Sequence, residues 1–532
     1  MIISDSAGPS SPQNHSECRC KATGELLGYS PLHNEEDLRL MLNKARTAQL
    51  EWSRTPLAER TRLIIRTRDF IVENLDQLAV TISRDTGKTR NDALVAELFP
   101  ATAAVSYYCK KAGRFLREQR LSPGHLATAN KRSKIVRVPW GIVAIISPWN
   151  YPFAIPFSEV VMALLAGNAV VLKTASQTQM VGLALKQCFE SIGLPDGLFS
   201  FINIPGSQAG DMLLGSGIDK LFFTGSVAVG QYLMGKAAST LTPVSLELGG
   251  NDPMLVCEDA DLYRAVMGAV WGGFTSAGQT CAGIERIYVH ERVYAPFLQL
   301  LKQKVESLQV GFGLEPDQDM GAMTTPGQIY TVSEQIRDAL DKGAVIYAQS
   351  GIPDGRNGKN FLPATVLTNV SHDMLVMQCE TFGPVVAVMK VNDMEEAIKL
   401  ANDSDLGLTA SVWSRNRQRA EQIARQIQAG VVNINDHLIS HGMPETPWGG
   451  FKQSGLGRTH GQIGFDEMTQ PQVIIKDIMP LAKRNLWWPP NNADVYNGIK
   501  GLIDFSYSHK LSRRINGIHR LLKILPRWFK EE

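Results

Sequence analysis

The spacing of apolar side chains predicts a helical start to the chain. Apolar residues recur at helical intervals in Glu35–Thr55 and in Leu57–Asp85, and each segment is expected to form an amphipathic helix. A further helical region is expected over Lys88–Leu116, which ends before a Ser-Pro-Gly turn sequence. Residues 1–20, which precede these helices, are rich in Ser and Pro and are expected to be disordered.

From Gly141 onwards, short apolar runs alternate with segments of helical spacing. The expected elements are, in order, strand Ile142–Ile146, helix Glu159–Leu165, strand Ala169–Leu172, helix Met180–Ile192, strand Leu198–Ile202, helix Gln208–Leu214 and strand Lys220–Phe223. The later elements are helix Tyr263–Ser276, strand Ile287–His290, helices Val293–Leu308 and Ile329–Lys342, strand Val345–Ala348, the apolar run Val385–Lys390 and helix Met394–Ala401. This alternation predicts an α/β fold with parallel sheets covered by helices, which bind nucleotides beyond the carboxyl ends of their strands.

The composition is that of a multidomain protein without a polyanion-binding character. With 532 residues, 44% of them hydrophobic, the chain is long enough for two or three domains. The net charge of +2 and the lack of a recognised nucleic-acid module argue against a nucleic-acid partner. The longest apolar run, Val160–Leu172, is interrupted by Gly167 and Asn168 and is too short to span a membrane. No export signal is found, so a cytoplasmic location is expected.

The seven cysteines are dispersed and odd in number, which does not indicate a disulfide framework. A set of cysteines without a disulfide framework is typical of proteins in the reducing cytosol. Cys18 and Cys20 lie close together but have no partner pair nearby, so they are interpreted as incidental thiols in an exposed tail. The sequence therefore predicts no metal site.

Three separated residues carry groups that suit cysteine-based acyl chemistry. Cys281 lies in the turn-prone segment Gly278–Gly283 and is the candidate nucleophile. Glu247 interrupts an apolar run before two glycines and is the candidate general base. Asn150 follows the strand Ile142–Ile146 and supplies an amide donor for an oxyanion. Together, these three groups can form and hydrolyse a thioester.

The ordered motifs around these residues resemble the NAD(P)-dependent aldehyde dehydrogenase family over Gly24–Ile478, including the signature Pro447–Arg458. The resemblance implies an aldehyde dehydrogenase-like α/β fold, with two doubly wound parallel-sheet domains, a small β oligomerisation arm and a C-terminal helical tail. It also implies a homodimer or homotetramer, in which the strand Thr469–Ile478 extends a neighbouring subunit's sheet. The implied parts are a cofactor-binding domain (residues 21–120 and 139–246), a catalytic domain (247–445), an arm (121–138 and 446–478) and the tail (479–532).

The resemblance further implies a reaction in which an aldehyde becomes a carboxylic acid. The aldehyde would form a thiohemiacetal and then a thioester on the cysteine, with hydride transfer to NAD(P). Two alternatives are a dehydrogenase of the succinate-semialdehyde type and a non-catalytic, membrane-associated member of the fold. A CoA-dependent acylating enzyme has less need of a water-activating base, so Glu247 favours hydrolysis.

Several motifs are candidates for cofactor binding. Gly225, Ser226 and Gly230 lie where a strand ends and a helix begins, so backbone N–H groups and the helix dipole there would hold a pyrophosphate. This stretch lacks the G-x-G-x-x-G pattern, but the family uses the shorter form. Trp149, next to Asn150, is assigned to the same site.

A second cofactor motif is identified by resemblance at Glu380-Thr-Phe382. Glu380 would accept hydrogen bonds from the nicotinamide ribose, and Phe382 would pack beside the nicotinamide ring. In relatives, the lysine at position 173 reaches the adenosine ribose, and a Glu often stands where this chain has Ser176. Because a Ser hydroxyl and Lys173 tolerate a 2′-phosphate that a Glu would repel, NADP is slightly favoured, while NAD stays possible.

The tail beyond Ile478 carries its own pattern. Residues 476–532 contain eleven Lys and Arg against five Asp and Glu, so positive charge is concentrated there. The apolar positions of one expected helix face are Leu511, Ile515, Ile518, Leu522, Leu525 and Phe529, and the cations are Lys510, Arg513, Arg514, Arg520, Lys523, Arg527 and Lys530. Such a helix could bind an anionic membrane surface and favour apolar, long-chain aldehydes. Alternatively, it could dock on its own dimer or cover the substrate mouth. Pro526 is expected to separate Trp528 and Phe529 from the helix.

Overall fold

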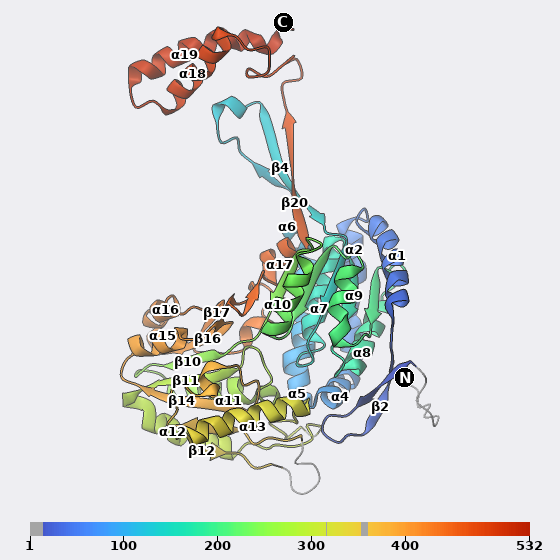
Figure 1. Cartoon of the computed structure of the whole chain (residues 1–532), viewed down its shortest axis with the longest axis vertical. Coiled ribbons are helices and arrows are strands. Elements are labelled where there is room, and N and C mark those ends of the chain that lie inside the picture. The colour runs from blue at the N-terminus through green and yellow to red at the C-terminus, as the bar shows by residue number, and fades with distance from the viewer. Residues whose placement is uncertain (1–13, 315, 353–359, 532) are drawn as a thin grey trace. The chain divides into compact units, whose positions relative to one another are not determined.

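The computed structural model describes residues 14–314, 316–352 and 360–531 and divides the chain into two compact units (Figure 1). The larger unit contains the described residues up to Phe115 together with Pro139–Gln470. The smaller unit contains Leu116–Val138 and the described part of Pro471–Glu532. Both of the predicted parallel sheets lie in the larger unit, and so does every predicted site residue.

The first sheet of the larger unit has six strands in the order β19-β9-β8-β5-β6-β7. Its strands are β5 (Ile142–Ile146), β6 (Ala169–Lys173), β7 (Phe199–Ile202), β8 (Lys220–Thr224), β9 (Val244–Glu247) and β19 (Gly455–Leu456). The strands β5 to β9 are parallel, and β19 pairs antiparallel with β9. The helices that pack around this sheet in Figure 1 are α7 (Ala154–Ala166), α8 (Gln179–Glu190), α9 (Gly206–Gly215) and α10 (Val227–Ala237). The predicted alternation of strand and helix is confirmed here, and the central strands β5, β6 and β8 are mostly apolar and largely buried, as expected for a parallel sheet covered on both faces.

The second sheet has seven strands in the order β12-β13-β14-β11-β10-β16-β17, parallel except for the pair β12 and β13. Its strands are β10 (Asp252–Val256), β11 (Ile284–His290), β12 (Val345–Gln349), β13 (Thr365–Thr368), β14 (Val385–Val391), β16 (Thr409–Trp413) and β17 (Val431–Ile434). Its helices are α11 (Leu262–Phe274), α12 (Glu291–Glu306), α13 (Pro326–Asp341), α15 (Met394–Asn402) and α16 (Arg417–Ala424). The fold class is therefore confirmed, with one antiparallel edge strand added to each parallel sheet.

The amino-terminal helices are more divided than the sequence suggests. Helix α1 (Glu35–Trp52) matches its prediction, but the single helix expected over Leu57–Asp85 is three helices: α2 (Leu57–Ile64), α3 (Arg66–Glu73) and α4 (Leu75–Thr86). Asn74 ends α3 in a non-helical conformation, where its side-chain amide donates to the carbonyl of Phe70. Asn competes with the helix for backbone partners in this way. The next helical region comprises α5 (Arg90–Ala93), a π-helical turn (Leu94–Leu98) and α6 (Phe99–Phe115).

The segment predicted to be disordered is ordered from residue 14 onwards. Strand β1 (His15–Arg19) pairs antiparallel with β2 (Leu26–Pro31). Cys18 and Cys20 are buried, so their assignment to an exposed tail is wrong, and burial raises the pKa of the Cys18 thiol to about 12. The pairing partner β2 supplies the order that the Ser- and Pro-rich composition alone did not indicate. The remaining residues of the predicted disordered segment, 1–13, lie outside the described part of the chain.

The smaller unit contains a three-stranded sheet and a pair of helices. Strand β20 (Thr469–Asp477), which begins in the larger unit, is at the edge of the order β20-β4-β3, with β4 (Lys131–Pro139) and β3 (Gln119–Leu121) beside it. The sequence prediction grouped residues 446–470 with this arm. They belong instead to the larger unit, because β19 pairs with β9 there.

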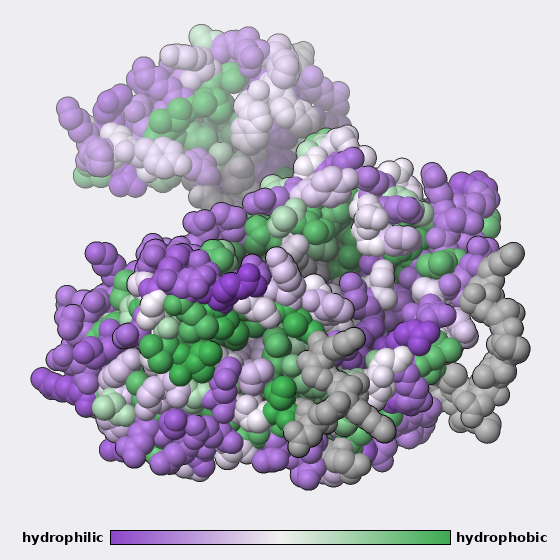
Figure 2. Space-filling model, turned by 60° about the horizontal axis from the view of Figure 1, so that its bottom comes forward, coloured by the Kyte–Doolittle hydropathy of each residue, from purple (hydrophilic) through white to green (hydrophobic). Residues whose placement is uncertain are grey.

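The tail forms two packed helices, α18 (Ala493–Tyr507) and α19 (Leu511–Ile524), followed by the 3₁₀ turn Leu525–Phe529. Glycines allow this close packing: a Cβ at Gly501 would lie 2.6 Å from the carbonyl oxygen of Gly517. Figure 2 shows apolar side chains at the surface of this unit, bordered by polar ones. The exposed apolar residues of the two helices are Tyr496, Ile503, Tyr507, Leu511, Ile515, Ile518 and Leu522.

The tail's cations are less uniformly solvated than predicted. Arg527 is buried, and its guanidinium donates to the backbone carbonyls of Trp488 and Pro490. Arg513 and Arg520 both lie beside Asp504, which offsets part of their charge. No helix among the described residues combines the length and the apolar character required to cross a bilayer.

Candidate active site

The loop that carries Cys281 follows α11 and has an unusual backbone. Ser276, Ala277 and Gly278 adopt left-handed conformations, with φ values of 52°, 55° and 67°. Two of these three residues have a Cβ, so this conformation is unfavourable unless surrounding contacts impose it. The backbone N–H of Ser276 donates to the buried carboxylate of Asp92 at 3.3 Å. The loop is therefore fixed by its neighbours and not by its own local preference.

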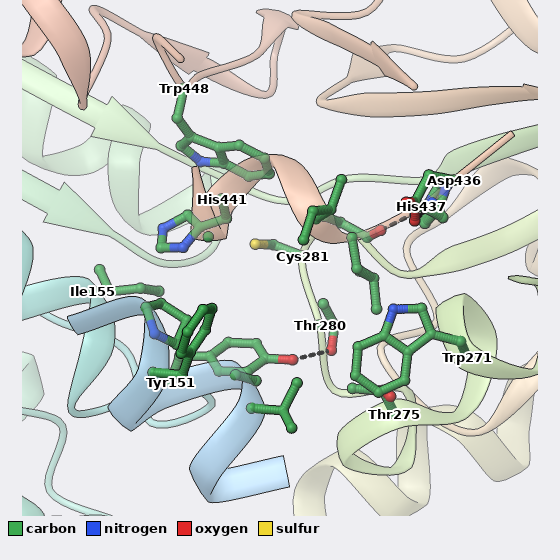
Figure 3. Close-up of a pocket in the computed structure, with 18 residues that line it drawn as sticks. Tyr151, Ile155, Trp271, Thr275, Thr280, Cys281, Asp436, His437, His441 and Trp448 are labelled. Atoms are coloured by element: carbon green, nitrogen blue, oxygen red, sulfur yellow. Dashed lines mark hydrogen bonds between the residues drawn. The ribbon is translucent and has the colours of Figure 1, made fainter. Parts of the chain in front are cut away.

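Three side chains hold the residues that flank the thiol, and two of them, Tyr151 and His437, are labelled in Figure 3. The amide of Asn150 donates to the carbonyl of Gln279 at 3.1 Å. The hydroxyls of Tyr151 and Thr280 share a hydrogen bond of 2.7 Å, and Nε2 of His437 lies 2.8 Å from the carbonyl oxygen of Ala282. The structure thus brings Asn150 to the cysteine loop, as the sequence predicted. Tyr151 and His437 were not identified from the sequence.

A buried ion pair positions the segment that contains Asn150. The ammonium group of Lys88 lies 2.7 Å from the carboxylate of Glu97, and it also donates to the backbone carbonyl of Asn150 at 2.6 Å. The other oxygen of Glu97 accepts the backbone N–H groups of Phe153 and Ala154, where α7 begins. Both charged side chains are almost fully buried. Neither residue was identified from the sequence, because the spacing of two charged residues does not show that their side chains are buried.

The Cys281 thiol and the Glu247 carboxyl group are both neutralised by their surroundings. Burial, followed by the charges of Glu380, Asp252 and Glu247, raises the pKa of Cys281. Burial and the neighbouring Glu159 raise the pKa of Glu247 well above its ordinary value, against the lowering effect of Arg458. Deprotonation of either group therefore requires a change in its environment, such as the arrival of ligands.

Glu247 opens onto a small cavity with both polar and apolar lining residues. This space, of about 20 Å³, is lined in part by Glu159, Glu247, Cys281, His441 and His460. A cavity of this volume has room for about one water molecule, and its carboxyl and imidazole groups offer that water polar partners. One carboxyl oxygen of Glu247 has no hydrogen-bond partner. The predicted base thus faces both the thiol and a site for a single water.

A second cavity, of about 220 Å³, contains most of the predicted cofactor residues. It is lined by Pro148, Trp149, Asn150, Thr224, Gly225, Ser226, Leu248, Gly249, Cys281, Gln328, Thr331, Glu380 and Phe382. Helix α10 begins at this cavity and has no side-chain cap, so its first N–H groups are suited to a phosphate. The residues therefore fit a dinucleotide, and Cys281 borders the same cavity.

The Glu380 turn is fixed by another buried acid. One oxygen of Glu285 accepts the backbone N–H groups of Thr381 and Phe382, both at 2.8 Å. Glu380 itself accepts the backbone N–H of Gly250 at 2.9 Å, and desolvation raises its pKa to about 7. The ring of Phe382 meets that of Trp149 edge to face, with 5.4 Å between centroids. Glu285 was not identified from the sequence.

Three predicted cofactor residues do not line this cavity. Lys173 ends β6, and its burial lowers the pKa of its ammonium group to about 8. Ser176 is exposed just beyond that strand. Gly230 packs within α10, where a Cβ would lie 2.6 Å from the side chain of Leu248. Gly230 therefore has a packing role here, and the adenosine role of Lys173 and Ser176 stays a prediction.

Cys281 also borders an apolar cavity of about 180 Å³ (Figure 3). In the figure, His441 and Trp448 lie across this pocket from Trp271 and Thr275, with Cys281 between them. The other lining residues include Phe99, Tyr151, Ile155, Asp436, His437, Leu438 and Ile439. Burial lowers the pKa of His437 and of His441 to about 4, so both imidazoles are neutral near pH 7. The sequence did not identify this set, because it comes from four distant segments.

A thiol placed between a nucleotide-sized cavity and a separate apolar cavity fits oxidoreductases that act through a covalent cysteine adduct. Comparison with known proteins makes this specific: the chain belongs to the aldehyde dehydrogenase family, whose model matches residues 9–474. It is an NAD(P)-dependent enzyme of that family that acts on an aldehyde.

Similar proteins differ in their named substrates. A 4,4'-diapolycopene aldehyde oxidase of Methylomonas is 41% identical, and the match covers 91% of this chain and 90% of that protein. A putative succinate-semialdehyde dehydrogenase [NADP(+)] of Mycolicibacterium smegmatis is 39% identical, covering 85% of this chain and 87% of the relative. The crystal structure of Staphylococcus aureus betaine aldehyde dehydrogenase in complex with NAD+ is 30% identical, with a TM-score of 0.84, and the match covers 90% of this chain and 94% of that one.

Proposed function

We propose that this enzyme oxidises apolar, long-chain aldehydes to carboxylic acids. The wall of the substrate cavity carries the proposal: none of the described residues that line it is Lys or Arg. Its apolar members include Phe99, Ile155, Trp271 and Trp448. Apolar walls stabilise a hydrocarbon chain by removing it from water. The relative named for a 4,4'-diapolycopene aldehyde supports the same substrate class.

The alternative substrate is succinate semialdehyde, for which several relatives are named. Its carboxylate would lose hydration in the cavity and would need a cation in compensation. Asp436, which lines the cavity, would repel that carboxylate. The charge of the wall therefore favours the apolar aldehyde.

In the proposed mechanism, the Cys281 thiolate attacks the aldehyde carbonyl and forms a thiohemiacetal. The Asn150 amide uses one N–H to hold Gln279, and its second N–H, together with the backbone N–H of Cys281, stabilises the oxyanion. NAD(P), when bound, accepts the hydride. Trp149, Gly225, Ser226, Glu380 and Phe382 would hold it, because they share the cavity beside the thiol.

Glu247 completes the proposed reaction by activating water. A water in the small cavity beside Glu247 would lose a proton to the carboxylate as its oxygen bonds to the thioester carbon. The carbon–sulfur bond then breaks, which releases the acid and returns the thiolate. The raised pKa of Glu247 suits a group that must accept a proton in a buried site.

The cofactor preference we propose is NADP over NAD. Position 176 carries an uncharged hydroxyl, and Lys173 supplies a cation at the end of β6, the strand that position 176 follows. The ammonium group of Lys173 would attract a 2′-phosphate, and Ser176 would not repel it as a carboxylate would. The ratio of kcat/KM for the two cofactors tests this, and a Ser176→Glu variant should shift that ratio toward NAD.

Two assembly properties are also proposed. The first is a dimer formed through the edge strand β20, where Val473, Ile474 and Ile475 are all exposed. An apolar edge strand of this kind favours pairing with a second copy. Light scattering tests it: Val473→Lys with Ile475→Lys should lower the mass in solution, and an unchanged mass would contradict the proposal.

The second is reversible attachment of the tail to anionic membranes. The exposed apolar residues of α18 and α19 would enter the interface, while cations such as Lys510 and Lys523 lie near the headgroups. Ile515→Asp with Leu522→Asp should abolish flotation with anionic vesicles at low salt. Leu241→Asp, which removes a highly exposed leucine of the larger unit, is the matched control. Equal flotation of the two variants would contradict attachment through the tail.

The substrate proposal is tested by the rate at which reduced cofactor forms. We expect kcat/KM to be higher for dodecanal than for hexanal and lowest for succinate semialdehyde. A preference for succinate semialdehyde would overturn the assignment. The absence of cofactor reduction with every aldehyde would favour a non-catalytic role.

A further inference from the structure

A further cavity, distinct from the cofactor cavity, lies beside the substrate cavity and shares lining residues with it. This lateral cavity, of about 290 Å³, has Val95, Trp271 and Thr275 in common with the space that contains Cys281. Its remaining apolar walls come from Met267, Val270, Phe274, Leu308 and Met320. The shared residues make the two spaces neighbours along one surface of α11.

The apolar wall is a continuous stripe of α11. Met267, Val270, Trp271 and Phe274 are spaced by three, one and three residues, so they lie on one helix face. That face is not fully covered, since Met267 is 41% and Trp271 38% exposed. Val95, on the π-helical turn Leu94–Leu98, lines the cavity too and is 52% exposed. Clustered exposed apolar side chains in a cavity indicate an apolar ligand.

We infer that the lateral cavity is a distal subsite, which takes the far part of an extended hydrocarbon chain whose aldehyde group lies at Cys281. The inference rests on the proposed function and deepens it. The lateral cavity adds about 290 Å³ to the space of about 180 Å³ beside Cys281, which gives an extended chain room to continue beyond the catalytic cavity. The shared residue Trp271 marks where the chain would pass from one space to the other.

The charges of the lateral cavity exclude an anionic occupant. Asp92 and Asp319 line it, and its described lining residues include no Lys or Arg. A phosphate or a carboxylate would therefore be repelled. The nucleotide has its own cavity at Trp149 and Glu380. An uncharged hydrocarbon chain is the occupant that fits the apolar walls and the two acidic residues of this cavity.

The test uses unreactive n-alcohols of six to sixteen carbons and titrates their binding by calorimetry. Affinity should rise about fourfold for each methylene buried, and the rise should continue beyond the length that fills the catalytic cavity. In Met267→Asp, the affinity should stop rising at that length, while hexanol binds as in the wild type. Tyr263→Asp, which alters an exposed residue of the same helix outside both cavities, is the matched control.

Two results would overturn the inference. One is a wild-type affinity that stops rising once the catalytic cavity is full. The other is a Met267→Asp variant that weakens hexanol and hexadecanol by the same factor. The same series with aldehydes reports kcat/KM, so failure of the proposed oxidation would be seen separately from failure of the subsite. If Met267→Asp does not fold, Leu308→Asp, which alters another apolar residue of the lateral cavity outside the catalytic cavity, replaces it.

Discussion

Glu159→Gln should make the protein more stable at alkaline pH and leave its stability nearly unchanged at pH 5. Glu159 is buried on α7 beside the cavity of Glu247, and burial raises the pKa of its carboxyl group from 4.5 to about 8. The groups around the carboxyl groups of Glu159 and Glu247 include Tyr108, Arg458, Glu467 and the neutral His441 and His460. At pH 9, the folded protein must hold an ionised carboxylate in a site that disfavours it.

The sign follows from the direction of the pKa shift. A carboxyl group whose pKa is raised on folding costs nothing below pH 4.5, and its cost grows until the pH reaches about 8. The full cost is about 5 kcal/mol, from about 1.4 kcal/mol for each pH unit. For a unit of several hundred residues, this corresponds to a rise in Tm on the order of 5 °C in Glu159→Gln.

The assay is thermal unfolding of the two proteins at pH 5 and pH 9 at one scan rate, because a large enzyme unfolds irreversibly. Glu51→Gln, at an exposed position of α1, controls for the loss of any carboxylate. A difference in Tm between Glu159→Gln and wild type that is the same at both pH values would refute the reasoning. So would a variant that is less stable than wild type at pH 9.

Three further outcomes are expected. Cys281→Ala should abolish aldehyde oxidation and leave the Kd of the cofactor, measured by fluorescence, nearly unchanged; oxidation at a comparable rate would exclude Cys281 as nucleophile. Glu247→Gln should give a burst of reduced cofactor followed by slow turnover in stopped-flow traces, and an unchanged steady-state rate would remove it from the mechanism. Lys88→Met should lower the free energy of unfolding by about 3–5 kcal/mol because it leaves the Glu97 carboxylate buried and unpaired. Lys44→Met, which breaks the exposed pair with Asp196, is its control, and equal losses of Tm would contradict the effect of burial.

The sequence predicted the parts of the fold that depend on local pattern. The strands Ile142–Ile146 and Ala169–Lys173 were found because each is an uninterrupted apolar run. Strand β1 was missed, since its order comes from pairing with β2 and not from its own residues. In the tail, the sequence predicted the helix that begins at Leu511 but not α18, and nothing in the local spacing shows that Gly501 and Gly517 would meet.

The candidate site shows the same division. Cys281, Glu247 and Asn150 lie in recognisable motifs, and each was identified. Lys88 and Glu285 act through contacts made across the fold, so their roles depend on which distant backbone groups they reach. The cavity walls were unpredictable for a related reason, since periodicity identifies an apolar helix face but not what faces it.

The left-handed turn before Cys281 has a consequence for how the enzyme loses activity during storage. Holding Ser276 and Ala277 at positive φ costs about 1 kcal/mol or more each, which only intact surroundings can offset. Gly278 admits no side chain there, because a Cβ would collide with the carbonyl of Gly383. Relaxation of this turn on warming or storage would release that cost while both sheets stay folded. A stored preparation should therefore lose its enzymatic activity before circular dichroism shows any unfolding. Bound nucleotide should lengthen the half-life of that activity.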